Sequence, residues 1–349
     1  MHRRPMALVA SIGLALLVAA PTAASGGEYS VDRLVSHGVP GTSDDPNLVN
    51  AWGLSAGPST PWWVSDNGTD HSTLYGGSGN TIPLVVTVTG GPTGTVYNGS
   101  SDFVVSHAGL SGPSLFLFAS EDGKIRGWNP GVPASSTKAY VIASRSGAGA
   151  SYKGLAIASV HGKNYLYASD FINARVDVFD GANHLQHWAG AFRDPRLPAG
   201  YAPFGIQAIG NRIYVTYAKQ NGEDEADGPH LGFVDAYKTN GKFVSRVASR
   251  GALNAPWGVA WAPANFGKFS GDLLVGNFGD GKIHAYKQTH SGWMLDGVLK
   301  DSSNKPIRID GLWAIAFGNG AAAGPTNSLY FTAGPNGEAD GLFGSITHN

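Results

Sequence analysis

The sequence contains no cysteine among its 349 residues, which excludes disulfides and a lipoprotein anchor. Charged residues make up only 14%, and 24 Lys and Arg stand against 25 Asp and Glu, for a formal net charge of −1. Nucleic acids and anionic membranes are usually recognised by a basic patch, and no basic block stands out here. We therefore expect no nucleic-acid partner and, once the leader described below is removed, no membrane partner.

Glycine and proline, by contrast, are plentiful, with 50 and 20 copies. So many chain-breaking residues do not suit a mainly helical protein, but they suit short strands joined by tight turns. Hydrophobic residues amount to 42%, which is enough for a large core. Because the repeats described next use nearly the whole chain, we expect residues 26–349 to form one domain and the protein to be a monomer.

A pattern of short apolar runs recurs with a period of about 50 residues. Its most regular column is a triplet that closes the second run of each copy. The triplets are Val64-Ser65-Asp66, Ala119-Ser120-Glu121, Ala168-Ser169-Asp170, Val215-Thr216-Tyr217, Val275-Gly276-Asn277 and Phe331-Thr332-Ala333. Runs of Val, Ile, Leu and aromatic residues between Gly, Asn, Asp or Pro predict strands joined by tight turns. Six such copies predict an all-β, six-bladed β-propeller with four-stranded antiparallel blades.

The first strands also share a motif, in which Gly or Ala follows a bulky residue. The copies are Trp52-Gly53-Leu54, Lys153-Gly154-Leu155, Phe204-Gly205-Ile206, Trp257-Gly258-Val259 and Trp313-Ala314-Ile315. The second copy is weaker, and we expect its first strand at Phe103–Ser106. The last copy ends at Ile346 with three strands, so we expect Glu28–Ser36 to supply the fourth and close the ring, which removes two open sheet edges.

Residues 1–25 have the organisation of a secretory signal peptide. A basic start at His2–Arg4 precedes an apolar run at Met6–Ala20 that is too short to span a bilayer comfortably, and small residues follow at Thr22–Gly26. We expect cleavage after Ala24 to Gly26 and a secreted mature protein, either extracellular or periplasmic. A short membrane anchor is the alternative interpretation.

Some of the motifs are specific enough to compare with a known family. They are Asn50-Ala51-Trp52-Gly53-Leu54, Ser65-Asp66-Asn67-Gly68, Glu121-Asp122-Gly123, Gly127-Trp128-Asn129-Pro130 and Leu329–Ile346. From about Leu34 to Ile346 the sequence resembles an uncharacterised family of secreted bacterial proteins with NHL-like repeats. That resemblance implies a six-bladed propeller and export, and it implies no activity. Some members carry a PEP-CTERM sorting tail, which this sequence lacks, so we expect release rather than surface sorting.

A more distant resemblance is to gluconolactonase-type propellers, with their Pro-aromatic-Gly first strands. It implies a metal at the channel mouth, held by acidic and amide side chains that include residues just before the first strands. Here those positions hold residues such as Trp52, Lys153 and Phe204, which cannot ligate a hard cation, and only Asp310 matches. The resemblance therefore carries over only in part.

Topology places two rings of residues at one mouth of the central channel. In an up-and-down blade the first strand starts, and the second strand ends, on the same face. The inner ring is Trp52, Lys153, Phe204, Trp257 and Trp313, with Asp310 nearby; the outer ring is Asp66, Glu121, Asp170, Tyr217 and Asn277. Flat aromatic faces beside polar groups suit a sugar or an aromatic molecule, so we expect ligand contacts from Trp52, Phe204, Trp257, Trp313 and Tyr217. The alternative is that the aromatic residues only seal the channel.

Two charged residues of the mouth are candidates for chemistry. Lys153 is the only cation of the inner ring, so Lys153 and Asp310 are the candidate catalytic pair, with Lys153 holding an anionic or carbonyl group of a ligand. The two side chains could instead pair with each other and serve the fold alone.

A calcium site is the third hypothesis for this face. Asp224, Glu225 and Asp227 lie in one acidic loop, and Asp66, Asp170 and Asn277 add oxygen donors from the outer ring, which are ligands that Ca²⁺ prefers. A solvated loop and structural carboxylates are the plain alternatives. His71 and His230, which fall in mouth-side loops, would suit a transition metal instead.

Two functions remain open at this stage. The first is an extracytoplasmic metal-assisted hydrolase of lactone-like or ester-like small molecules. The second is a non-catalytic propeller that binds a small molecule or carbohydrate, or serves as a scaffold. No nucleophile elbow is present, so the sequence does not decide between them.

Overall fold

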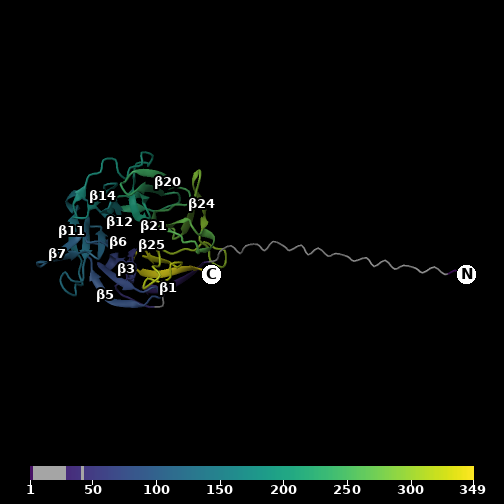
Figure 1. Cartoon of the computed structure of the whole chain (residues 1–349), viewed down its shortest axis with the longest axis horizontal. Coiled ribbons are helices and arrows are strands. Elements are labelled where there is room, and N and C mark those ends of the chain that lie inside the picture. Colours follow the sequence, from purple (N-terminus) through teal and green to yellow (C-terminus); the bar gives the residue numbers. More distant parts are fainter. Residues whose placement is uncertain (3–28, 41–42) are drawn as a thin grey trace.

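Six four-stranded antiparallel sheets follow one another around a ring in the computed structural model (Figure 1). The structure describes residues 1–2, 29–40 and 43–349, so the signal peptide expected over residues 1–25 lies outside the described residues except for Met1 and His2. The predicted all-β, six-bladed propeller is confirmed. Within the described ranges, no helix is long and apolar enough to cross a bilayer.

The first three blades run along the chain in order, each with its first strand at the channel. Blade one contains β2 (Ala51–Ser55), β3 (Trp62–Asp66), β4 (His71–Tyr75) and β5 (Thr81–Thr87). Blade two contains β6 (Pro92–Tyr97), β9 (Phe116–Ser120), β10 (Lys124–Trp128) and β11 (Tyr140–Ser144). Blade three contains β12 (Tyr152–Val160), β13 (Lys163–Asp170), β14 (Arg175–Asp180) and β15 (Leu185–Gln186).

The second half of the ring continues the same order. Blade four contains β16 (Tyr201–Ile209), β17 (Arg212–Asn221), β19 (Phe233–Lys238) and β20 (Phe243–Ser249), with the short β18 (Asp224–Ala226) paired to β17. Blade five contains β21 (Pro256–Trp261), β22 (Leu273–Asn277), β23 (Ile283–Thr289) and β24 (Gly292–Val298). Blade six contains β25 (Leu312–Phe317), β26 (Leu329–Ala333), β27 (Gly341–His348) and β1 (Tyr29–His37). One-turn 3-10 helices lie at η1 (Asn67–Thr69), η2 (Ser146–Ala148) and η3 (Gly267–Phe269).

The expected first strand of blade two was wrong. Residues 103–106 instead lead into a separate hairpin of β7 (Val104–His107) and β8 (Leu110–Pro113), and the channel-side strand is β6. The segment Pro92-Thr93-Gly94 has the same form as Pro203-Phe204-Gly205 and Pro256-Trp257-Gly258 in later blades. A small polar Thr93 stands where the other copies carry a bulky side chain, which concealed the match.

Each first strand carries an irregularity at the residue that opens it. The register with the second strand shifts there in all six blades, from Ala51/Leu54 in blade one to Leu312/Ile315 in blade six. A β-bulge re-aims a side chain relative to the regular pleat. The bulges therefore set the direction in which the side chains of Trp52, Lys153, Trp257 and their counterparts point at the channel axis.

Neighbouring first strands approach so closely at these bulges that there is little room for a side chain. A Cβ atom added to Gly205 would collide with the backbone oxygen of Trp257 in the next blade, and one added to Gly258 would collide with that of Trp313. Glycine in the repeated motif thus permits the packing of blade against blade.

Two hydroxyl groups of the triplets tie the first strands of neighbouring blades together. The Ser169 hydroxyl donates to the Phe204 carbonyl of the next blade (2.6 Å), and the Thr332 hydroxyl of blade six donates to the Trp52 carbonyl of blade one (2.5 Å). Thr93 makes a comparable bond to the Tyr152 carbonyl (2.7 Å). These three hydroxyl groups therefore satisfy backbone carbonyls at the bulges of the next blade.

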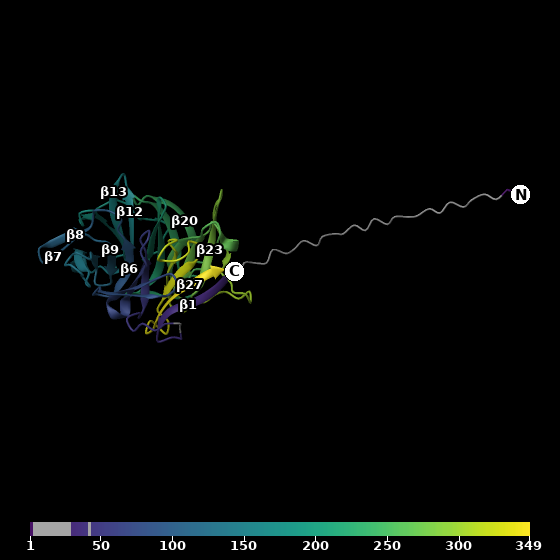
Figure 2. The ribbon, with the colours of Figure 1, turned by 60° about the horizontal axis from the view of Figure 1, so that its bottom comes forward.

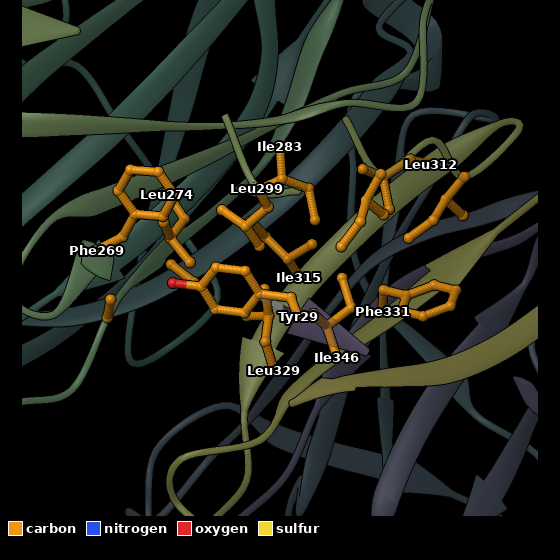
Figure 3. Packing of buried hydrophobic residues seen from close by; sticks show 14 of the residues in the cluster. Tyr29, Phe269, Leu274, Ile283, Leu299, Leu312, Ile315, Leu329, Phe331 and Ile346 are labelled. Carbon is orange, nitrogen blue, oxygen red and sulfur yellow. The ribbon is translucent and has the colours of Figure 1, made fainter. Parts of the chain in front are cut away.

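Strand β1 closes the ring, as predicted, by pairing antiparallel with β27 from Tyr29↔His348 to His37↔Gly341. Figure 2 shows β1 in purple alongside the yellow C-terminal strand. The Tyr29 ring is buried between blades five and six, where its hydroxyl donates to the Phe266 carbonyl (2.9 Å). In Figure 3 it lies among Phe269, Leu329 and Ile346, so β1 contributes to the hydrophobic core as well as to the sheet.

A matched pair on β1 tests whether this strand is integral to the fold. Val35 is fully buried, whereas Val31 is 38% exposed. Val35→Ala should lower the free energy of unfolding by about 2 kcal/mol, because it removes buried methyl groups and leaves a cavity. Val31→Ala should change it by less than about 0.5 kcal/mol. Urea denaturation of both variants is the measurement, and equal midpoints for the two would contradict ring closure by β1.

Candidate functional site at the channel mouth

The aromatic residues of the inner ring fill the channel instead of lining an open site. Trp313 and Phe204 are fully buried, and Trp52 and Trp257 are 2% and 9% exposed. The ring centroids of Trp52 and Trp313 lie 3.8 Å apart, and Phe278 stacks on Trp313 at 4.2 Å. We call this group the aromatic plug; it also includes Phe171. The sequence left open whether these aromatic residues contact a ligand or seal the channel, and their packing is that of residues that seal it.

Hydrogen bonds fix the orientation of the plug. The indole N–H groups of Trp52 and Trp313 both donate to Oδ1 of Asn50, at 2.9 Å each. The indole of Trp257 donates to the Lys153 carbonyl, also at 2.9 Å. Behind the plug, the first strands enclose a cavity of about 20 Å³, room for about one water. A ligand at this face would therefore bind above the plug, where polar residues gather.

Lys153 is the buried cation on which these polar residues converge. Its side chain is 2% exposed, and its Nζ donates to Glu121 Oε1 (2.5 Å) and Asp224 Oδ1 (3.0 Å) while lying 5.1 Å from the Trp52 ring centroid. Burial alone would lower the pKa of Lys153, but the charge and hydrogen bond of Glu121, with those of the neighbouring acids, raise it above its ordinary value. Lys153 is therefore charged at neutral pH.

An arc of amides and carboxylates continues around the mouth from Glu121. Asn67 Nδ2 donates to Glu121 Oε2 (2.9 Å), and Asn50 Nδ2 donates to Asn67 Oδ1 (3.2 Å) and Glu338 Oε2 (2.6 Å). Burial is the main cause that raises the pKa of Glu338, and the bond from Asn50 offsets part of the rise. We call the whole set the mouth network. It comprises Asn50, Asn67, Glu121, Lys153, Asp224, Glu225 and Glu338.

The acidic insertion of blade four supplies one side of this network. Instead of a free loop, it folds as a hairpin in which β18 pairs with β17 and Glu225 lies opposite Gln220. Asp224 reaches Lys153 from its tip, while Asp227 is exposed on the outgoing arm beside Gly279. Burial raises the pKa of Glu225 to about 7, with the Lys153 charge acting in the opposite direction.

The other expected metal ligands do not join this network. Asp170 accepts from Asn173 and pairs with Arg175 (3.2 Å) inside blade three. Asn277 donates to the Ala252 carbonyl and to Asp280 within blade five. Asp66 is fully buried in blade one. Each of these three residues stays with its own blade and away from the mouth network. Within residues 29–40 and 43–349, no three His, Asp or Glu side chains lie close enough together to hold a metal ion.

Two further expected site residues also lie elsewhere. Asp310 accepts from the Asn336 amide (2.9 Å) and lines an exposed cleft of about 160 Å³ with Arg308 and Leu342, so it does not pair with Lys153. Tyr217 is buried between blades, its hydroxyl 2.6 Å from that of Tyr237.

Sequence reasoning missed three members of the network, Asn50, Asn67 and Glu338. Asn50 precedes the first strand of blade one, and Asn67 and Glu338 fall in loops after second strands, which is the face that the topology argument selects. Their signal was therefore positional. None of the three falls in a repeated column, whereas Glu121 does and was assigned to the outer ring but not to the expected ligands.

No family model matches the chain. The sequence is similar to two uncharacterised proteins of Acanthamoeba polyphaga mimivirus. It is 32% identical to R648 over 315 residues, covering 86% of this chain and 76% of R648, and 32% identical to L690 over 331 residues, covering 91% and 85%. The chain belongs to the same family as these proteins.

Solved structures confirm the architecture. Superposition on streptogramin B lyase gives a TM-score of 0.52 at 11% identity, covering 92% of this chain and 98% of the lyase. Superposition on the soluble aldose sugar dehydrogenase of Escherichia coli also gives 0.52, at 13% identity, covering 92% and 100%. At such identities the likeness shows the propeller fold and nothing about the reaction.

A matched tryptophan pair tests the plug. Trp313→Ala should lower the free energy of unfolding by about 3–5 kcal/mol, since it empties a fully packed aromatic site. Trp261→Ala, at a position 37% exposed on the rim, should cost less than about 1 kcal/mol. The comparison uses chemical denaturation, and a stable, native-like Trp313→Ala protein would contradict a sealing role.

The pKa of Glu225 makes stability depend on pH. Its value is about 7 in the folded protein against an ordinary 4.5, so the folded state binds the proton more tightly and the free energy of unfolding falls as pH rises from about 4.5 to 7. Glu225→Gln should remove part of that fall, on the order of 1 kcal/mol after solvent screening. Glu223→Gln, exposed at the same hairpin, is the control. Denaturation at pH 5 and pH 8 measures the effect, and identical slopes for wild type and Glu225→Gln would count against it.

Proposed function

We propose that this protein is exported as a monomer and binds a small sugar-like molecule at the mouth network. The observation that supports the proposal most is the convergence on one buried lysine of side chains from separate blades. Glu121 comes from blade two, Asp224 from blade four and, through Glu121, Asn67 from blade one. Moving the charge of a lysine out of water costs free energy. A channel that only has to be sealed could be filled by apolar side chains without that cost, so the buried charge supports a binding role.

The chemistry of the network favours a neutral polyol. Carboxylates and amides offer acceptors and donors side by side, which suits neighbouring hydroxyl groups of a sugar ring. The acids Glu121, Asp224, Glu225 and Glu338 outnumber the cation Lys153 in this set. An anionic ligand such as a sugar acid would be repelled. Trp52 contributes the floor below Lys153, so binding above it should change tryptophan fluorescence.

Hydrolysis of a lactone or ester is a second candidate, supported by one observation. A carboxyl group with a pKa of about 7, as for Glu225, is suited to general acid–base catalysis at neutral pH. Lys153, which is charged and close by, could polarise a carbonyl group. In this candidate Glu225 takes the catalytic place that Asp310 had in the sequence-based hypothesis, and calcium is not needed at the mouth.

Titration calorimetry and fluorescence with neutral sugars, sugar acids, lactones and aryl esters test both candidates. Neutral sugars should bind and sugar acids should not, and Glu121→Gln and Glu338→Gln should weaken binding about tenfold, as expected for loss of one charged hydrogen bond. Asp32→Asn, on the outer strand β1, should leave affinity unchanged. Absence of binding by every compound would leave a scaffold role instead. Turnover of a lactone or ester that Glu225→Gln abolishes would favour the hydrolase.

A further inference from the structure

A carboxylate without a partner is buried where blades six and one meet. Asp66 closes β3, is fully buried, and neither of its carboxylate oxygens has a hydrogen-bond partner within the described residues. The Thr73 hydroxyl of the adjacent strand lies close enough to lower the pKa of Asp66, but it too is buried and is not in hydrogen-bonding geometry with either carboxylate oxygen. A buried polar group without a partner is strongly unfavourable, so something must satisfy these oxygens.

A second carboxylate comes to the same place from the segment between β1 and β2. Asp45 is 7% exposed and accepts from the Tyr75 hydroxyl (2.9 Å) and from the Asn47 backbone and side-chain amides (3.0 Å each). Asp66, Thr73 and Tyr75 alternate along β3 and β4 on the face that packs against blade six. Burial and the Asp45 charge raise the pKa of Asp66 well above its usual range, while Thr73 offsets part of the rise.

Other blades contain the same arrangement with a built-in cation. In blade three, Asp170 takes the position of Asp66, and Asp177 takes that of Thr73, opposite Ala168. Arg175 pairs with both carboxylates, at 3.2 and 2.9 Å, and Arg145 lies 3.6 Å from Asp177.

In blade four, too, one arginine pairs with two buried carboxylates. There Asp235 lies opposite Val215, and Arg246 pairs with both Asp235 and Asp194. Buried carboxylate pairs in this fold are thus neutralised by arginine.

Blade one lacks that arginine. The position of Arg175 is occupied by His71, opposite Asp66, and in the described part of the chain neither Asp45 nor Asp66 forms an ion pair with Lys or Arg. Two buried carboxylates without a counter-charge are the environment that a bound cation stabilises.

We propose that a Ca²⁺ ion is held between blades six and one by Asp45 and Asp66, with the hydroxyls of Thr73 and Tyr75 beside it. The donors are oxygen atoms only, which Ca²⁺ prefers, and backbone carbonyls or water complete its coordination. This site is separate from the mouth network and does not depend on the proposed sugar binding. Because Asp45 follows β1, the ion would brace the junction at which the ring closes.

Thermal unfolding of the full protein with Ca²⁺ or with EDTA tests the proposal. A cation bound only by the folded state raises the melting temperature by mass action, and we expect a rise of about 5 °C at saturating Ca²⁺. Elemental analysis should find about one calcium per chain. No shift with Ca²⁺ and no bound metal would overturn the site and leave Asp66 as a protonated side chain.

Three variants locate the ion. Asp66→Asn should abolish the Ca²⁺-dependent shift, whereas Asp170→Asn, at the equivalent position of blade three, should keep it. His71→Arg should supply the missing guanidinium, as Arg175 does, and so raise the melting temperature in EDTA while removing the response to Ca²⁺. A Ca²⁺ response that survives both Asp66→Asn and His71→Arg would place the ion elsewhere and overturn the proposal.

Discussion

The close approach of the six first strands at the axis is the constraint on which the molecule depends. Antiparallel strands expose backbone groups wherever a bulge interrupts the ladder, and here a bulge opens every first strand. Glycine makes room for the neighbouring backbone, as at Gly205, and hydroxyl groups such as those of Ser169 and Thr332 satisfy the freed carbonyls across blades. The blades are therefore joined near the axis by directed bonds, while the surfaces farther out are joined by hydrophobic packing.

The close approach of the first strands also separates the apolar plug of the channel from the polar mouth network above it. Bulges turn large aromatic side chains inward, where Trp52, Trp257 and Trp313 occupy the space that a ligand would need. What remains for recognition is the layer above, built from loops whose polar side chains meet over Lys153. Because Lys153 is buried yet charged, it holds its neighbours in fixed positions, and the proposal of a small polar ligand depends on that preorganisation.

Much of the architecture could be predicted from the sequence, because strand spacing and the Ser/Thr triplets repeat in a way that few folds allow. The number of blades, the closing strand and the second and third strands followed from that repetition. The site could not be predicted to the same degree, because a bulge changes which face a side chain takes, and a shift of one residue reverses it. Asp170 pairs with Arg175 of its own blade, Lys153 pairs with Glu121 and Asp224 instead of Asp310, and Thr93 hid a first strand because it is small. The partners of Lys153 come from distant loops, and no local pattern connects Glu121 with Asp224.

Closure by β1 has a consequence for how the protein is made. Of the strands that the structure describes, β1 is synthesised first, and its partner β27, about 300 residues away, is synthesised last. During synthesis Tyr29 and Val35 have no core to enter, and the outer edge of blade six does not yet exist. The earlier blades can pack on one another as they appear, so the growing molecule passes through an open crescent that has unpaired edges. The junction of blades five, six and one can form only after β27 has been synthesised, so the sheet edges of the crescent stay unpaired until then.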